Sequence, residues 1–150
     1  MLFIKIMAVF AMSSAIGVLY RIPRSLLIYA SATGVAGWML MYLVAQSGIS
    51  SIMANFLGSM AVGLVAEFLA RALKTPATIF TIPGFIPLVP GREAYTAMRF
   101  MVEGKFNEGV AMGMLTLLTG GAIAFGIFVS STLYRLVRMS TDYQVEGRGQ

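Results

Sequence analysis

Residues 75–98 read TPATIFTIPGFIPLVPGREAYTAM, and the interpretation of the whole chain depends on this stretch. It contains four of the five prolines of the protein, namely Pro76, Pro83, Pro87 and Pro90. Proline has no backbone N–H and clashes with the preceding helical turn, and glycines at 84 and 91 add further conformational freedom. No charged residue lies between Lys74 and Arg92. The stretch is therefore apolar enough to enter a membrane but is predicted not to form a regular helix there.

A broken apolar segment needs a special environment inside a bilayer. Hydrocarbon offers no partners to unpaired backbone groups, so the segment must be enclosed by protein or line a water-filled cavity. Interrupted helices of this kind build the substrate sites of secondary transporters. The alternative interpretation is a tight proline-rich loop beside the bilayer.

The composition indicates an integral membrane protein. The 150 residues are 58% hydrophobic and 11% charged, with a mean hydropathy of +0.83, whereas soluble domains carry roughly 25% charged residues. The net charge of +5 comes from basic residues at the ends of apolar runs, a pattern of cytoplasmic anchoring rather than of nucleic-acid binding. Because the chain has no Cys and no His, disulfides, thiol catalysis and common metal sites are excluded. We expect no metal and no cofactor.

The hydropathy pattern predicts an all-α integral membrane protein with one transmembrane domain over residues 1–139. Regular spans are expected at about residues 1–20, 25–45, 51–73 and 107–136, with a broken segment at 76–91 and an interfacial helix at 92–104. Residues 140–150 are expected to form a disordered polar tail. A signal peptide cleaved near Ser13-Ser14-Ala15 is the alternative for the first span.

The third span carries a face of small residues. These are Ser59, Gly63, Ala66 and Ala70, and small side chains at such spacing allow another helix to approach closely. We expect this face to be available for a neighbouring subunit.

A polar row at steps of four residues runs beside that face and includes Asn55, Ser59 and Glu67. Glu67 is an acidic residue inside an apolar run, and intramembrane carboxylates are typical of proton or ion pathways. Glu67, Asn55 and Ser59 are therefore hypothesised to couple export to a proton or another ion. The alternative is an i,i+4 ion pair between Glu67 and Arg71 that holds the helix end.

The proline-rich stretch also carries a resemblance. The motifs are residues 76–81 (PATIFT), 86–91 (IPLVPG) and 94–98 (AYTAM), and they are similar to the signature of the threonine/serine exporter family. The closest likeness is to its short YjjB-like membrane subunit, which corresponds to the second half of the long exporters. This resemblance implies a multi-pass protein of the bacterial inner membrane. It also implies export of amino acids such as threonine and serine, or of a dicarboxylate such as succinate. The expected partners are membrane lipid and a first-half (YjjP-like) subunit, or further copies of the chain.

A substrate site is predicted where the helix restarts after Pro90-Gly91. The first turn of a helix exposes backbone N–H groups and the positive end of the helix dipole, which suit a carboxylate. The predicted substrate-binding residues are Thr81, Pro83, Gly84, Pro87, Pro90, Gly91 and Tyr95. Gly84 is expected to mark a second break, and Tyr95 to add a hydroxyl donor.

Two other functions compete with export. The chain is interpreted alternatively as a membrane scaffold or assembly subunit, in which the proline-rich stretch is a structural turn. An enzyme is disfavoured, because the sequence has no nucleophile elbow and no phosphate-binding glycine loop.

The distribution of basic residues predicts five crossings, with the N-terminus outside and the C-terminus in the cytoplasm. The turns at Arg21–Arg24 and Arg71–Lys74 and the end of the last span at Arg135–Arg138 then all face the cytoplasm. A re-entrant proline-rich segment is the alternative, and it would place the C-terminus opposite the Arg71–Lys74 turn.

Overall fold

The structure, a computed structural model, describes residues 2–146, with side chains described as far as Val137. Within this range the chain is helical, with no strand, as predicted from its hydropathy. The elements are α1 (Leu2–Leu19), α2 (Arg24–Gln46), α3 (Ser51–Ala72), α4 (Thr78–Phe85), the 3₁₀ helix η1 (Ile86–Leu88), α5 (Gly91–Val102) and α6 (Phe106–Glu146).

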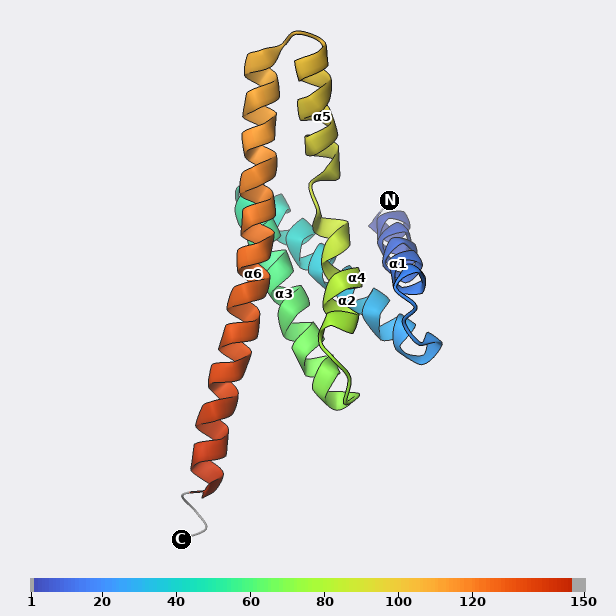
Figure 1. Ribbon diagram of the computed structural model, residues 1–150, viewed down its shortest axis with the longest axis vertical. Coiled ribbons are helices and arrows are strands. Elements are labelled where there is room, and N and C mark those ends of the chain that lie inside the picture. The colour runs from blue at the N-terminus through green and yellow to red at the C-terminus, as the bar shows by residue number, and fades with distance from the viewer. Residues whose placement is uncertain (1, 147–150) are drawn as a thin grey trace.

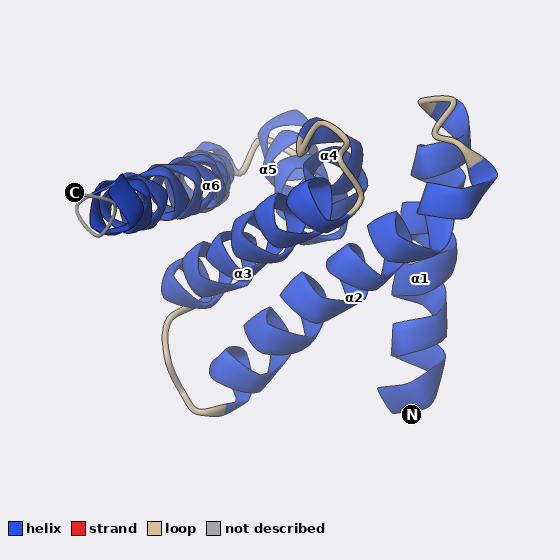
Figure 2. Ribbon diagram, turned by 90° about the horizontal axis from the view of Figure 1, so that it is seen from below, coloured by secondary structure: helices blue, strands red, loops and turns tan. Residues whose placement is uncertain are grey.

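Helices α1, α2, α3 and α6 lie side by side in a row, and the short helix α4 packs against the middle two. Figure 2 shows α1 and α6 on opposite sides of the central pair α2 and α3, with α4 packed against that pair. Among the described residues, four segments are long and apolar enough to cross a membrane: α1, α2, α3 and Phe106–Val137 of α6. The apolar segment Thr78–Leu88 is shorter. The predicted all-α, multi-pass membrane fold is thereby confirmed.

The small-residue face of α3 is used for packing inside the chain. A Cβ added to Gly63 would lie 2.8 Å from the Cβ of Ser130, and one added to Gly126 would lie 2.6 Å from the carbonyl oxygen of Phe56. Helices α3 and α6 thus approach as closely as these glycines allow. The prediction that this face is free for another subunit is wrong, because α6 covers Ser59 and Gly63, while Ala66 and Ala70 pack in one cluster with Ala30 of α2 and Phe80 of α4.

The proline-rich stretch is more helical than its prolines suggest. Residues Thr78–Phe85 form an α-helix with Pro83 inside it, and a 3₁₀ turn follows before the backbone becomes extended at Val89. Pro83 lies close to the end of this short helix, so its missing N–H removes a single helical bond, the one to the carbonyl of Ile79. Phe80 is completely buried beneath α2 and α3, which enclose this part of the stretch. The prediction of no regular helix is therefore wrong for residues 78–85, and the break lies at Val89–Pro90.

The turns after α1, α3 and α5 share one backbone geometry, which a basic residue adopts in two of them and glycine in the third. At the end of α3, Thr75 N–H bonds to the carbonyl of Ala70 at 2.8 Å, while Lys74 takes a left-handed conformation with φ of 52°. Arg21 does the same at the end of α1 with φ of 55°, whereas Gly104, with φ of 76°, serves the end of α5. Left-handed conformations favour glycine, so Arg21 and Lys74 are held there at some cost in backbone strain.

The two basic turns lie at the same end of the bundle (Figure 1). Helix α4 then carries the chain back toward the other end, so α3 and α6 run parallel. The Arg71 guanidinium lies 5.3 Å from the ring centroid of Tyr134, and Phe56 stacks on Phe125. Tyr134 of α6 thus lies beside the Arg71 turn, and the five crossings and their re-entrant alternative stay predictions.

Helices α5 and α6 form a hairpin that extends past the ends of α2 and α3 (Figure 1). A Cβ added to Gly109 would lie 2.7 Å from Met101 Cγ, so the two helices pack tightly. At the turn, Glu103 accepts bonds from Lys105 Nζ at 3.2 Å and Arg99 Nε at 2.9 Å. The bond from Lys105 is the main cause that lowers the pKa of Glu103 below its usual value. The interfacial position predicted for residues 92–104 stays a prediction.

Helix α6 is longer than a bilayer requires. Its 41 residues correspond to about 60 Å, against a hydrocarbon core about 30 Å thick. It continues to Glu146, so the disorder predicted from residue 140 onward is wrong as far as Glu146. Residues 147–150 of the predicted tail lie outside the described range.

Candidate functional site

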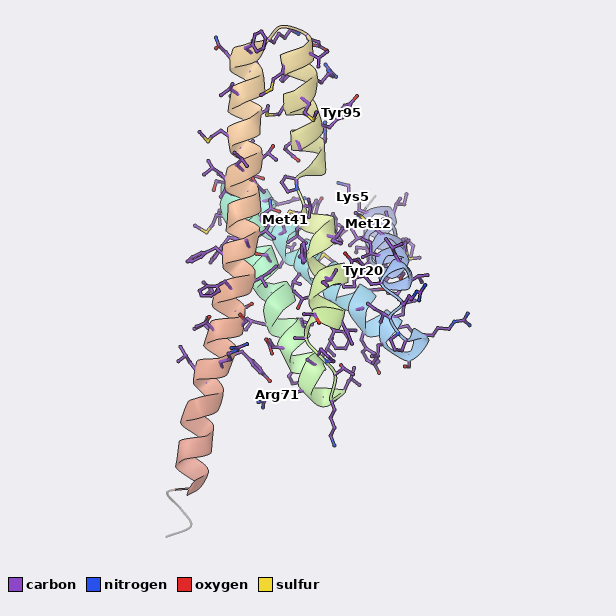
Figure 3. The ribbon with its side chains drawn as sticks, in the orientation of Figure 1. Lys5, Met12, Tyr20, Met41, Arg71 and Tyr95 are labelled. Carbon is purple, nitrogen blue, oxygen red and sulfur yellow. The ribbon has the colours of Figure 1, made fainter. Side chains whose placement is uncertain are left out.

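A cavity of about 270 Å³ lies where the broken stretch meets α3 and α6. Its wall is formed by residues 87–90, by the first turn of α5 and by one face each of α3 and α6. Apolar contacts come from Met41 of α2 and Leu115 of α6; Figure 3 labels Met41. Pockets for drug-sized ligands measure about 300–1,000 Å³, so this cavity suits a small solute.

The polar groups of the cavity come from separate helices. Ser51 and Asn55 belong to α3, Arg92 and Glu93 to α5, and Thr119 to α6. Asn55 is 6% exposed, and its amide donates one hydrogen bond to the carbonyl of Ser51 at 2.9 Å. A membrane-spanning bundle buries such groups at a cost, so a polar cavity within it points to a polar ligand.

Helix α5 begins at this cavity with unsatisfied donors. Its N-cap is Pro90, which provides no side-chain hydrogen bond. Gly91 N–H bonds to the carbonyl of Val89 at 2.8 Å and Ala94 N–H to that of Pro90 at 3.1 Å. Within the described part of the chain, the N–H groups of Arg92 and Glu93 have no acceptor. These donors and the helix dipole favour an anion in the cavity.

Three of the predicted site residues line this cavity. Pro87 and Pro90 come from the broken stretch, and Asn55 comes from the polar row of α3. Gly91 stands between two lining residues, and a Cβ added to it would meet nothing within 4 Å. The structure thus brings together the second half of the stretch and the start of the polar row.

The first half of the stretch lies elsewhere. The Thr81 hydroxyl donates to the carbonyl of Ala77 at 2.9 Å, and Pro83 is buried. A Cβ added to Gly84 would lie 2.7 Å from Val62 Cγ1 and 3.1 Å from Thr33 Cγ2. Gly84 does not mark a second break, because it lies inside α4 and allows that helix to contact α2 and α3.

Tyr95 also lies away from the cavity. Its side chain is 69% exposed and extends from the side of α5 that faces away from α6 (Figure 3). The hydroxyl donor predicted at this position therefore does not reach the cavity in this arrangement. Ser59 packs against Gly126 and donates to the carbonyl of Phe56 at 2.8 Å, so it does not line the cavity either.

Glu67 is half-buried on α3 and does not line the cavity. Among the described residues no ion pair joins it to Arg71, whose guanidinium lies over the ring of Tyr134 instead. The predicted Glu67–Arg71 pair is therefore absent. Its spacing along α3 allowed the pair, but a residue of α6 provides Arg71 with a different contact.

Sequence reasoning did not select Arg92, Glu93 or Thr119 as site residues. Arg92 and Glu93 could have been selected from the sequence, because they directly follow Pro90-Gly91 in the helical turn predicted to bind a carboxylate. Thr119 had no such signal, because its role depends on how α6 is rotated toward α3. Among the described residues no cluster of three acidic, His or Cys side chains could hold a metal ion.

Comparison with known proteins identifies the family. The sequence matches the family described as "Threonine/Serine exporter, ThrE" over residues 5–133. An uncharacterised protein of Haemophilus influenzae is 24% identical over 135 residues, which cover 83% of this chain and 46% of that protein. The chain thus spans about half the length of this relative. No solved structure matches the chain. With its match over residues 5–133, the chain belongs to the threonine/serine exporter family.

Proposed function

We propose that this protein is a membrane subunit of a secondary exporter of small hydrophilic metabolites. The substrates in view are amino acids of the threonine and serine type, or a dicarboxylate such as succinate. The proposed location is the bacterial inner membrane, and the proposed driving force is the proton gradient, with Glu67 as the coupling carboxylate. Export rather than a scaffold role is favoured by the cavity.

The observation that carries the proposal is the polar cavity at the break in the chain. A purely structural turn has no need of an open space lined by Asn55, Arg92, Glu93 and Thr119 within an apolar bundle. Interrupted segments with free backbone donors are a general device by which membrane transporters hold a carboxylate.

A second polypeptide is part of the proposal. The relative is about twice as long as the region that matches this chain, which supports a partner corresponding to the other half, such as a first-half (YjjP-like) subunit. The chain's own helices leave large apolar side chains exposed on the hairpin, among them Val102 at 88% and Leu117 at 73%. We therefore expect a hetero-complex or a homo-oligomer, and no flux from an isolated monomer.

The transport assay uses proteoliposomes loaded with labelled threonine or succinate. Vesicles containing the chain and its candidate partner should release substrate faster than empty vesicles, and vesicles with either subunit alone should not. Absence of flux for both solutes in every combination would argue for a scaffold.

The proposed orientation can be tested separately, because the chain has no cysteine of its own. Ser47→Cys lies in the exposed α2–α3 turn and should react with an impermeant thiol reagent added to intact cells. Ser140→Cys should react only after the cells are opened. Labelling of Ser140→Cys in intact cells would reverse the orientation.

A further inference from the structure

Thr119 differs from four other threonines that lie inside helices. The hydroxyls of Thr33, Thr81, Thr96 and Thr116 each donate to the carbonyl four residues earlier, at 2.8–2.9 Å. This is the usual arrangement for a helical threonine. Thr119 is 4% exposed and lines the cavity, yet its hydroxyl has no hydrogen-bond partner among the described residues. The hydroxyl is not one of the buried oxygens that lack a partner, because it borders the cavity, where a ligand can bond to it.

The two charged residues of the cavity are also unpaired. The ion pairs in the described range involve Glu103, while Arg92 and Glu93 take part in none. Both belong to the first turn of α5, beside its free N–H groups. The cavity therefore offers a cation, an anion and backbone donors within one helical turn.

The positions of these groups suit a solute that carries both charges. A carboxylate is favoured by the free N–H groups and the Arg92 guanidinium, and an ammonium group by the Glu93 carboxylate. A dicarboxylate would gain the first contact, but its second carboxylate would meet Glu93. Glu93 is half-buried, so solvent weakens this repulsion but leaves a preference against a second carboxylate.

We propose that Glu93 and Thr119 determine the selectivity of this cavity, so that it holds a zwitterionic amino acid with a side-chain hydroxyl and rejects a dicarboxylate. Glu93 binds the ammonium group, and Thr119, with the amide of Asn55 on the α3 wall of the same cavity, binds the substrate hydroxyl. The inference rests on the proposed function, because it concerns the same cavity.

Binding of three solutes to the full chain tests the proposal. The chain is purified with any subunit that accompanies it, and the solutes are L-threonine, L-2-aminobutyrate, which lacks the hydroxyl, and succinate. The unchanged protein should bind threonine at least about tenfold more tightly than succinate, a difference of about 1.4 kcal/mol. It should also bind threonine more tightly than 2-aminobutyrate, by about fivefold or more.

Matched variants separate the roles of the two residues. Glu93→Gln should weaken threonine binding about tenfold or more and reduce or reverse the preference over succinate. Glu93→Asp keeps the charge and should retain that preference. Thr119→Val should remove the preference for threonine over 2-aminobutyrate and leave succinate binding unchanged. Its control is Thr116→Val, since the Thr116 hydroxyl already bonds to Met112.

The outcomes distinguish this inference from the proposed function. If the unchanged protein binds threonine but Glu93→Gln keeps the same ratio of threonine to succinate affinity, the assignment of Glu93 is overturned. If Thr116→Val and Thr119→Val have equal effects, the assignment of Thr119 is overturned. If the unchanged protein binds succinate and not threonine, the inference fails and an exporter function stands. Binding of none of the three solutes would overturn both. Melting temperatures of all variants show whether each remains folded.

Discussion

The two halves of the proline-rich stretch have opposite surroundings. Residues 78–85 form α4 and fit closely between α2 and α3, with Phe80, Pro83 and Gly84 buried. Residues 87–93 turn away from that contact and border a cavity with free backbone donors. The first half contains one proline and one glycine and the second half two prolines and one glycine, so these residue types do not separate the halves.

The difference between the halves lies in what their glycines contact. Gly84 has two side chains of neighbouring helices within 3.1 Å of where a Cβ would stand, whereas Gly91 has none within 4 Å. A glycine in the first half allows helices to pack, and one in the second half leaves space open. We conclude that the first half positions the second, and that substrate chemistry belongs to the second.

The largest effect is expected from filling the space at Gly84. Gly84→Ala should lower the free energy of unfolding by about 1–3 kcal/mol, because the new methyl group overlaps Val62 and Thr33, and Gly84→Leu should prevent folding. The measurement is the apparent melting temperature in detergent, with size-exclusion chromatography to detect aggregation.

The control for this prediction makes the same change in open space. Gly113→Ala on α6 meets nothing within 4 Å and should raise stability by about 0.5–1 kcal/mol, as alanine does in helix interiors. Equal melting temperatures for the Gly84 and Gly113 variants would remove the contrast between packed and open glycines.

A smaller effect, on binding rather than on folding, is expected at Gly91. Gly91→Leu adds a large side chain beside the free N–H groups of α5 and should weaken substrate binding roughly 10–100-fold, the value of one charge-assisted hydrogen bond. The melting temperature should not fall, because the site is open. Phe128→Leu, at a side chain 64% exposed on α6, is the control and should leave binding intact. Unaltered affinity in Gly91→Leu would place the site away from the start of α5.

Glu67 lies outside both halves, and its variant tests whether coupling is separate from binding. Glu67→Gln keeps the shape and hydrogen-bonding capacity of the side chain but cannot titrate. We expect proton-driven flux to fall about tenfold or more, equivalent to about 1.4 kcal/mol, while substrate affinity and counterflow exchange persist. Flux with an unchanged pH dependence would show that Glu67 is structural, even though it lacks the ion pair with Arg71.

Much of the fold could be predicted from hydropathy, while the site required tertiary information. The four long helices could be located from apolar runs and turn residues, because the length and hydropathy of a helix can be read from one continuous stretch of sequence. The helix containing Pro83 was missed, since enclosure by α2 and α3 outweighs one lost backbone bond. Thr119 was not predicted as a site residue, because nothing in the sequence around it distinguishes it from Thr116, whose hydroxyl bonds to its own helix. The partner of Arg71 proved to be Tyr134, a residue far along the chain.

The smallest expected effect concerns the turn that leads into the proline-rich stretch. Lys74 holds a left-handed conformation that costs a non-glycine residue roughly 1–2 kcal/mol, whereas its attraction to the negative end of α3 contributes about 0.3–1 kcal/mol and is weakened by exposure to solvent. The strain is the larger of the two, so Lys74→Gly should raise the free energy of unfolding by up to about 1 kcal/mol. Gly104→Ala, at the matching position after α5, should lower it by a similar amount. The Lys74→Gly variant also bears on the topology, because Lys74 lies with Arg71 on the side proposed to be cytoplasmic. Since Arg71 remains, Lys74→Gly should not expose Ser140→Cys to reagent outside the cell. A destabilised Lys74→Gly protein would mean that the charge of this turn outweighs its strain.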